Sequence, residues 1–145
     1  MLVDLVGRAP GPLVQRLAEG DPAVRLHADV EDLADFYAAA DAVVAPIRAG
    51  GGTRIKLLEA FAHRVPVVTT PLGAEGLDVR DGIHVLLAET PAELAAACRR
   101  LRDDPALGDR LRAAAARLVA ERYEASLIEG EIRRVYAELL AGRAA

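Results

Sequence analysis

Short apolar runs that alternate with helical patterns constrain the fold of this 145-residue chain more than any other feature. The runs are rich in branched residues and are bounded by turn residues, which is typical of β-strands. Several are apolar on both faces, as a parallel sheet covered by helices requires. The predicted strands span residues 2–6, 24–28, 42–45, 65–69 and 83–88.

Helical spacing of apolar residues appears between the strands and dominates after the last one. A helix is expected over residues 32–40, because apolar residues recur there at i, i+3, i+4 and i+7, namely Leu33, Phe36, Tyr37 and Ala40. After the last strand, Thr90 and Glu93 have the spacing of a capping box. Two further helices are expected, one beginning at Asp104 and one across residues 128–139.

This order of elements predicts an α/β fold, in which a doubly wound parallel sheet is closed by C-terminal helices. The length is that of one ordinary domain. We therefore expect residues 1–145 to form a single domain.

Composition argues against several partners and locations. A formal net charge of -4 disfavours a nucleic-acid-binding surface, because affinity for a phosphate backbone comes from clustered Lys and Arg. Cys98 is the only cysteine and the first residues lack a leader pattern, so we expect a cytoplasmic protein without a disulfide. No apolar stretch approaches the roughly 20 residues that span a bilayer, so membrane contact is expected to be peripheral at most.

The segment PIRAGGGTRIKLLEAFA, residues 46–62, carries the strongest signal for chemistry. It joins the strand at 42–45 to a helix expected over 53–63, at the sheet edge where ligands bind. Its glycines let the backbone approach a ligand, and the helix start offers unpaired N–H groups to an anion. We therefore predict a phosphate or diphosphate site. Its candidates are Gly50, Gly51, Gly52 and Thr53, with the cations Arg48, Arg54 and Lys56, the last being the only lysine.

Glu59 is an acid placed within the apolar stripe of this helix. Ile55, Leu58, Glu59 and Ala62 lie at i, i+3, i+4 and i+7, so the carboxylate is expected to face the sheet. It lies roughly 10 Å along the helix from the phosphate-binding end, which suits the ribose of a bound nucleotide. An ion pair with Lys56 is the alternative, although its order of charges is the weaker one.

A second loop, TPLGAEGL at residues 70–77, follows the strand at 65–69. Gly73 and Gly76 would let it fold tightly over the same sheet edge, where Thr70 and Glu75 are candidates to contact a sugar. An ordinary turn at the end of a strand is the alternative.

Other mechanisms lack the residues that they need. Ser126 is the only serine and lies in an expected helix, while Cys98 lies on an apolar helix face, so no activated nucleophile is evident. The three histidines are scattered and no Asp-x-Asp occurs, so no metal is expected. Residues 50–56 also lack the P-loop order of Gly-Lys followed by Ser or Thr.

Five motifs occur in succession along nearly the whole chain. With them the sequence resembles the glycosyltransferase family 4 proteins, specifically the C-terminal, nucleotide-sugar-binding half of a GT-B enzyme. The resemblance implies a Rossmann-like sheet and a nucleoside-diphosphate sugar as the donor. The motifs are LVGRAP at 5–10, LHADVEDLADFYAAADAVVAP at 26–46, GGTRIKLLEAFAHRVPVVTT at 51–70, GAEGLDVRDGIHVLLAETPAELAAA at 73–97 and LVAERY at 118–123.

The resemblance also implies roles for individual residues. Glu59 matches the second glutamate of the family's Glu-x7-Glu signature, which binds the donor ribose, whereas the first falls at Gly51. Lys56 would hold the diphosphate with the backbone of Gly52 and Thr53. An N-terminal acceptor domain and the first strand of this half would precede the chain. The residues that would flank the base are Leu26, Ala28 and Val30.

The expected function is donor binding in retaining transfer of a sugar from a nucleoside-diphosphate sugar to an acceptor. Departure of the diphosphate builds negative charge on its oxygens, which Lys56, Arg54 and the N–H groups of residues 51–53 would stabilise without a cofactor. Because the acceptor would lie against the missing half, we expect the chain alone to turn over little or nothing. Two alternatives remain: a non-catalytic nucleotide-binding or interaction module, and a GT-B epimerase, which the shortage of convergent acids and histidines disfavours.

Overall fold

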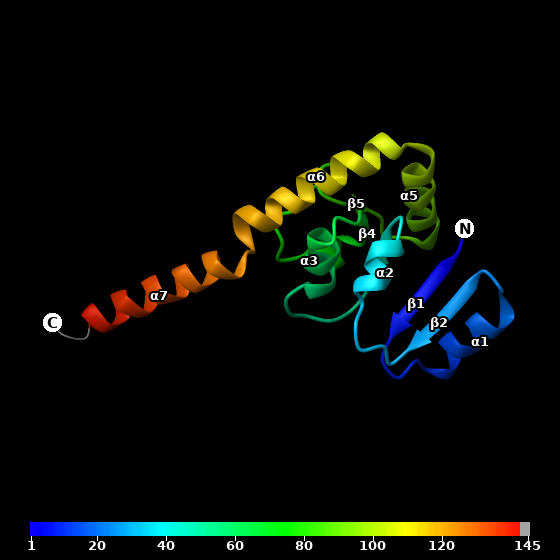
Figure 1. Ribbon diagram of the computed structural model, residues 1–145, viewed down its shortest axis with the longest axis horizontal. Helices are drawn as coiled ribbons and strands as arrows, with labels where there is room; N and C mark the ends of the chain where they lie inside the picture. Colours follow the sequence, from blue (N-terminus) through cyan, green and yellow to red (C-terminus); the bar gives the residue numbers. More distant parts are fainter. Residues whose placement is uncertain (143–145) are drawn as a thin grey trace. The chain divides into compact units, whose positions relative to one another are not determined.

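The computed structural model describes residues 1–142. Figure 1 shows it as a ribbon whose colours follow the sequence. The chain forms two compact units, the first comprising Met1–Phe36 and the second beginning at Tyr37. Helix α2 (Ala34–Ala39) contains the junction between them.

The first unit is a strand, helix and strand. Strands β1 (Val3–Gly7) and β2 (Val24–Ala28) pair in parallel, with Val3 opposite Val24 and Gly7 opposite Ala28. A parallel pair needs a crossover connection, and helix α1 (Pro12–Gly20) supplies it. This helix is absent from the sequence-based prediction, although Pro12 at its first turn is a recognised start signal.

The second unit is built on three parallel strands in the order β3, β4, β5. The register places Val43 opposite Val67 and Val68 opposite Leu86. Hydrogen bonds of the turn from Arg80 to Val85 occupy much of the expected strand 83–88, so β5 is only two residues long. The elements are β3 (Val43–Ala45), α3 (Ile55–Ala62), β4 (Val67–Thr69), α4 (Pro71–Ala74), β5 (Leu86–Leu87), α5 (Pro91–Asp103), α6 (Pro105–Arg122) and α7 (Ala125–Gly142).

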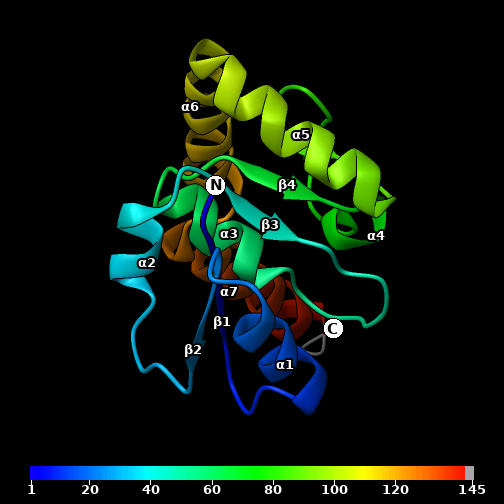
Figure 2. The same cartoon turned by 90° about the vertical axis from the view of Figure 1, so that its right-hand side faces the viewer.

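Helices cover both faces of this sheet. Successive strand residues point to opposite faces, so Val67 packs in one core cluster with α3 and Val68 in another with α5. Figure 2 shows α3 and α5 on opposite sides of β3 and β4. Helix α6 serves both clusters, with Leu111 in the α5 cluster and Ala115 in the α3 cluster. The buried residues contributed by α3 and α5 are Leu57, Ala60, Phe61, Leu94, Ala97 and Leu101.

These observations confirm the predicted fold class, an α/β arrangement of parallel strands with helices on both faces. Strand pairing is divided into two sheets, one in each unit, where the sequence predicts one layer. The predicted capping box is confirmed, because the Thr90 hydroxyl accepts from the Glu93 N–H at 3.2 Å and the Glu93 carboxylate accepts from the Thr90 N–H at 2.9 Å. Within residues 1–142, no helix combines the length and apolar composition needed to cross a bilayer.

Candidate functional site

The segment between β3 and α3 is an open loop that only glycine fits at two positions. Gly50 and Gly52 have φ of 112° and 92°, in the left-handed region that side chains disfavour. A Cβ atom added at Gly50, Gly51 or Gly52 would meet nothing within 4 Å. The space in front of this backbone is therefore free for a ligand.

Backbone N–H groups in this loop have no hydrogen-bond partner in the described part of the protein. Among residues 1–142, no protein acceptor takes a hydrogen bond from the N–H group of any residue from 48 to 54. Helix α3 begins at Ile55, two residues later than predicted, and Arg54 provides no side-chain cap. Unpaired donors at a helix start, where the dipole is positive, form a site for an anion.

Arg54 is a buried residue that connects α4 with the loop residues 50–52, called here the glycine segment. Its side chain is 7% exposed and donates to the carbonyl oxygen of Leu72 at 2.8 Å and to that of Gly50 at 3.4 Å. The guanidinium also lies 3.6 Å from the exposed carboxylate of Glu75. Its Nε is buried without a partner in the described part of the chain. Arg54 therefore holds the glycine segment in place through hydrogen bonds from a buried side chain.

Lys56 and Glu59 lie on α3 but do not pair. Lys56 is exposed in the first turn, and the ion pairs found within residues 1–142 do not include one between these two side chains. Glu59 Oε2 instead accepts from the Tyr37 hydroxyl at 3.1 Å. The Tyr37 ring stacks on His63, with centroids 4.8 Å apart and planes at 14°. Burial, and then the negative charge of Glu59, raises the pKa of Tyr37 to about 12.

The predicted buried stripe of α3 is wrong. The residues that enter the core are Leu57, Ala60 and Phe61, whereas Ile55 is 59% exposed. Both sets have helical spacing, and packing against β4 and α6 selects the one that begins at Leu57. Glu59 consequently lies half-buried at the margin of the core, where a carboxylate avoids much of the cost of desolvation.

The loop after β4 is closed by its own side chains. Thr70 is 4% exposed, and its hydroxyl donates to the carbonyl oxygen of Ile47 and accepts from the Gly73 N–H at 2.9 Å. A Cβ at Gly73 would lie 2.3 Å from the Thr69 hydroxyl oxygen. These contacts make Thr70 the N-cap of α4 and make Gly73 a packing position, while Glu75 faces solvent beside Arg54.

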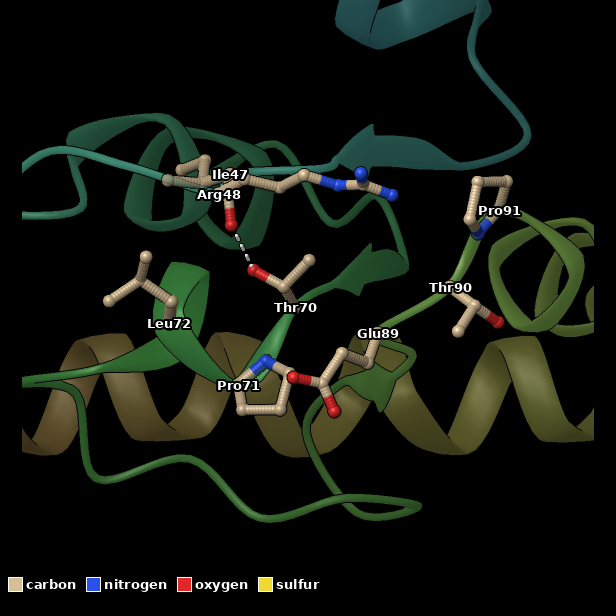
Figure 3. A pocket seen from close by; sticks show the side chains of 8 residues that line it. All are labelled: Ile47, Arg48, Thr70, Pro71, Leu72, Glu89, Thr90 and Pro91. Carbon is tan, nitrogen blue, oxygen red and sulfur yellow. Dashed lines mark hydrogen bonds between the residues drawn. The ribbon is translucent and has the colours of Figure 1, made fainter.

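A cavity of about 530 Å³ opens at the carboxyl ends of β3, β4 and β5. Figure 3 shows the Arg48 side chain extending across it toward Pro91, while the Thr70 hydroxyl turns to the carbonyl of Ile47. Three loops that are far apart in sequence form its wall, so no single sequence motif predicts the cavity. The sequence signal that could have located it is that each of these loops follows a parallel strand. The lining residues are Ile47, Arg48, Thr70, Pro71, Leu72, Glu89, Thr90 and Pro91.

The residues expected to flank the base belong to the first unit. Leu26 and Ala28 lie in β2, and Val30 lies two residues beyond its end. Asp29 has φ of 53°, and its carboxylate accepts from the Ala9 N–H at 3.0 Å, which joins the loops that follow β1 and β2.

Comparison with known proteins identifies related sequences and folds. A family model described as "Glycosyl transferases group 1" matches residues 2–104, which is most of the chain. The matched range contains the glycine segment, α3 and the loop after β4. No curated protein sequence matches the chain.

Several solved structures share the fold. HepE from Anabaena in complex with UDP-glucose has 21% sequence identity and a TM-score of 0.79; the match covers 94% of this chain and 41% of HepE. Sucrose-phosphate synthase from Thermosynechococcus elongatus has 24% identity and a TM-score of 0.82, covering 96% of this chain and 38% of that enzyme. The pneumococcal O-GlcNAc transferase GtfA, in complex with UDP and GlcNAc, has 17% identity and a TM-score of 0.77, covering 97% and 30%. The chain thus spans well under half the length of these proteins.

Proposed function

This chain belongs to the group 1 glycosyl transferases, and from that premise we propose that its glycine segment holds the diphosphate of a nucleoside-diphosphate sugar. One observation carries the proposal. The N–H groups of residues 48–54 have no protein acceptor within the described chain, and the space beside the backbone at Gly50, Gly51 and Gly52 is open. Such a row of free donors is suited to phosphate oxygens.

The protein binds the donor through its diphosphate, which is also the leaving group of the transfer. As its bond to the sugar breaks, negative charge grows on its oxygens, and donors already aimed at them lower the barrier. Lys56, exposed in the first turn of α3, adds a positive charge that offsets the charge of the diphosphate without a metal ion. Arg54 contributes a second positive charge from a buried position, where it also donates a hydrogen bond to the carbonyl oxygen of Gly50. The proposed transfer is retaining, of the family 4 type.

Glu59 is proposed to receive the ribose hydroxyls, because one of its carboxylate oxygens faces Tyr37 and the other is free for a ligand in the described chain. The base-flanking roles of Leu26, Ala28 and Val30, which lie in the first unit, stay predictions. For the donor sugar we propose Glu75, because of the three predicted residues it alone has a side chain that reaches solvent, whereas the Thr70 hydroxyl and Gly73 are engaged in contacts within the loop. The complexes of HepE and GtfA with UDP compounds support a nucleotide-sugar donor.

The acceptor is proposed to bind to a domain beyond these 145 residues, since the chain spans only 41% of HepE. Binding of the donor and completion of the transfer are then separable. We expect the purified chain to bind nucleotide and to transfer sugar little or not at all.

Calorimetric titration of UDP, GDP and ADP tests this proposal. One of the three should bind the wild type, and Lys56→Ala and Glu59→Ala should each weaken that binding by about tenfold, the effect of losing one charged hydrogen-bonding partner. Arg117→Ala and Glu121→Ala remove exposed charges from α6 and serve as matched controls with unchanged affinity. Equal affinities for the wild type, Lys56→Ala and Glu59→Ala would contradict the site.

A non-catalytic nucleotide-binding module is the second candidate, and the position of Gly51 favours it. The first acid of the Glu-x7-Glu signature is replaced there by a residue without a side chain, so Gly51 cannot make the side-chain contact to the donor that this acid makes. This candidate predicts nucleotide binding without sugar transfer even after the remaining domain is supplied.

A further inference from the structure

The hydroxyl of Tyr37 holds one oxygen of the Glu59 carboxylate. Tyr37 lies on α2 and donates to Glu59 Oε2 on α3 at 3.1 Å. Within residues 1–142, Glu59 Oε1 receives no hydrogen bond from the protein. The carboxylate therefore has one oxygen occupied by the protein and one available to a ligand.

The Tyr37 ring is itself held in place. One side stacks on His63, which follows the last residue of α3, with centroids 4.8 Å apart. The ring also packs against the core cluster that contains Leu57 and Phe61. With the ring fixed at these contacts, its hydroxyl has a defined position from which to donate.

Protonation of the hydroxyl gives the bond its direction. A phenol is protonated at neutral pH, and burial, followed by the charge of Glu59, raises the pKa of Tyr37 further, to about 12. The bond is thus a neutral donor to a charged acceptor, which is stronger than a bond between neutral groups. It restrains rotation of a side chain that is only half-buried.

We propose that Tyr37 is a positioning residue, which orients the Glu59 carboxylate so that Oε1 meets the ribose hydroxyls of a bound nucleotide. This inference rests on the proposed nucleotide site. Tyr37 does not touch the ligand in this arrangement; it determines where the acid that does so can point. The sequence pattern assigns Tyr37 only to the apolar stripe of its helix. The position of its hydroxyl in the structure adds the role of orienting Glu59.

Tyr37→Phe isolates this role, because it keeps the ring on His63 and removes only the hydroxyl. The measurement is the ratio of affinities for a nucleotide and for its 2′,3′-dideoxy counterpart, with UDP, GDP and ADP each compared with the matching analogue by calorimetry. The wild type should prefer the ribose form. Tyr37→Phe should reduce that preference about fivefold, as expected for one hydrogen bond, while affinity for the dideoxy form stays the same. Adding Tyr37→Phe to Glu59→Gln should produce no further loss.

A matched control is Tyr123→Phe, which removes a hydroxyl that accepts from the Asp78 N–H at 2.9 Å on another part of the unit. Its affinity ratio should equal that of the wild type. Urea unfolding of each variant verifies that the folded protein is compared.

The outcomes separate this inference from the function on which it rests. An unchanged ratio in Tyr37→Phe, together with a reduced ratio in Glu59→Gln, overturns the role of Tyr37 and leaves the nucleotide site standing. Equal weakening of both the ribose and the dideoxy form by Tyr37→Phe also overturns it, because that is the effect of general loosening. An unchanged ratio in Glu59→Gln, or binding of none of the three nucleotides, overturns the proposed site and this inference with it.

Discussion

Two glycine-containing connections follow neighbouring parallel strands, and they are built in opposite ways. After β3, the backbone at Gly51 lies beside open space and the N–H groups of residues 48–54 have no protein acceptor within the described chain. After β4, Thr70 uses its hydroxyl as donor and acceptor, and Gly73 is enclosed by the Thr69 hydroxyl. The first connection offers its polar groups to a ligand, and the second uses them to hold itself.

The difference shows that a glycine at a strand end has no single meaning. In the first connection, glycine permits the positive φ of Gly50 and Gly52 and leaves a free surface. In the second, glycine lets a helix approach a strand closely. Arg54 links the two, since it donates to the carbonyl oxygens of both Gly50 and Leu72. The closed connection thus supports the open one.

Gly73→Ala should have the largest effect on stability and is the sharpest test of the contrast. The new methyl group would lie 2.3 Å from the Thr69 hydroxyl oxygen, which is itself bonded to the Ala45 carbonyl, so the core must shift. We expect the free energy of unfolding to fall by about 2–3 kcal/mol, as measured with urea. Gly51→Ala, where the methyl group meets nothing, should change it by less than about 0.5 kcal/mol. Equal losses at both positions would remove the contrast.

Thr70→Val tests whether the second connection depends on its hydroxyl. The substitution keeps the shape but removes the N-cap of α4 and the bond to Ile47. The free energy of unfolding should fall by about 1–2 kcal/mol. Thr53→Val, at an exposed position in the open connection, is the matched control and should leave stability nearly unchanged. A stability loss for Thr53→Val as large as that for Thr70→Val would refute this prediction.

Arg54→Lys tests the link between the two connections. Lysine keeps the charge but lacks the planar fork that reaches Gly50 and Leu72 together. We expect a loss of about 1 kcal/mol in the free energy of unfolding and a nucleotide affinity lowered about threefold, because the loop is held less firmly. Arg64→Lys, at an exposed position after α3, is the control for the change of residue type. If nucleotide affinity is unchanged in Arg54→Lys, the two connections are independent.

The smallest effect is a pH dependence that extends the comparison to Glu59. Because the pKa of Tyr37 is about 12 in the folded chain and roughly 10 when unfolded, the unfolded state loses this proton first as pH rises. The contribution of Tyr37 to stability is therefore complete below pH 10 and is lost between about pH 10 and 12. Urea unfolding of the wild type and Tyr37→Phe across this interval should show their stabilities converging. Parallel curves would mean that Tyr37 is not held in its neutral form.

The sequence was sufficient to predict the fold class, the capping box at Thr90 and the strand order along the chain, because these depend on local periodicity and on caps. It failed for the buried face of α3, since two stripes of that helix have the same spacing and only tertiary packing chooses between them. It also missed α1, although Pro12 begins this nine-residue helix and Leu13 and Leu17 are spaced four residues apart, because so short a segment between two strands was not assigned to an element.

For the candidate site, the sequence located the open glycine segment but could not distinguish side chains that face a ligand from those that hold the loop. Arg54 and Thr70 appear equally polar in both roles, and their burial becomes visible only once β4 and α4 are in place. The partner of Glu59 came from an apolar stripe, where a tyrosine hydroxyl is not evident as a functional group. A cytoplasmic location, the absence of a resident metal and the action of residues 1–145 as one donor-binding domain stay predictions.

Amide chemical shifts during a nucleotide titration test the central claim most directly. With the nucleoside diphosphate that binds, the amide signals of Gly51, Gly52 and Thr53 should move in proportion to occupancy, and the matching nucleoside, which lacks phosphate, should leave them in place. The signals of Gly73 and Ala74 in the closed connection should move far less. Unchanged signals from residues 51–53 at saturation would contradict the account.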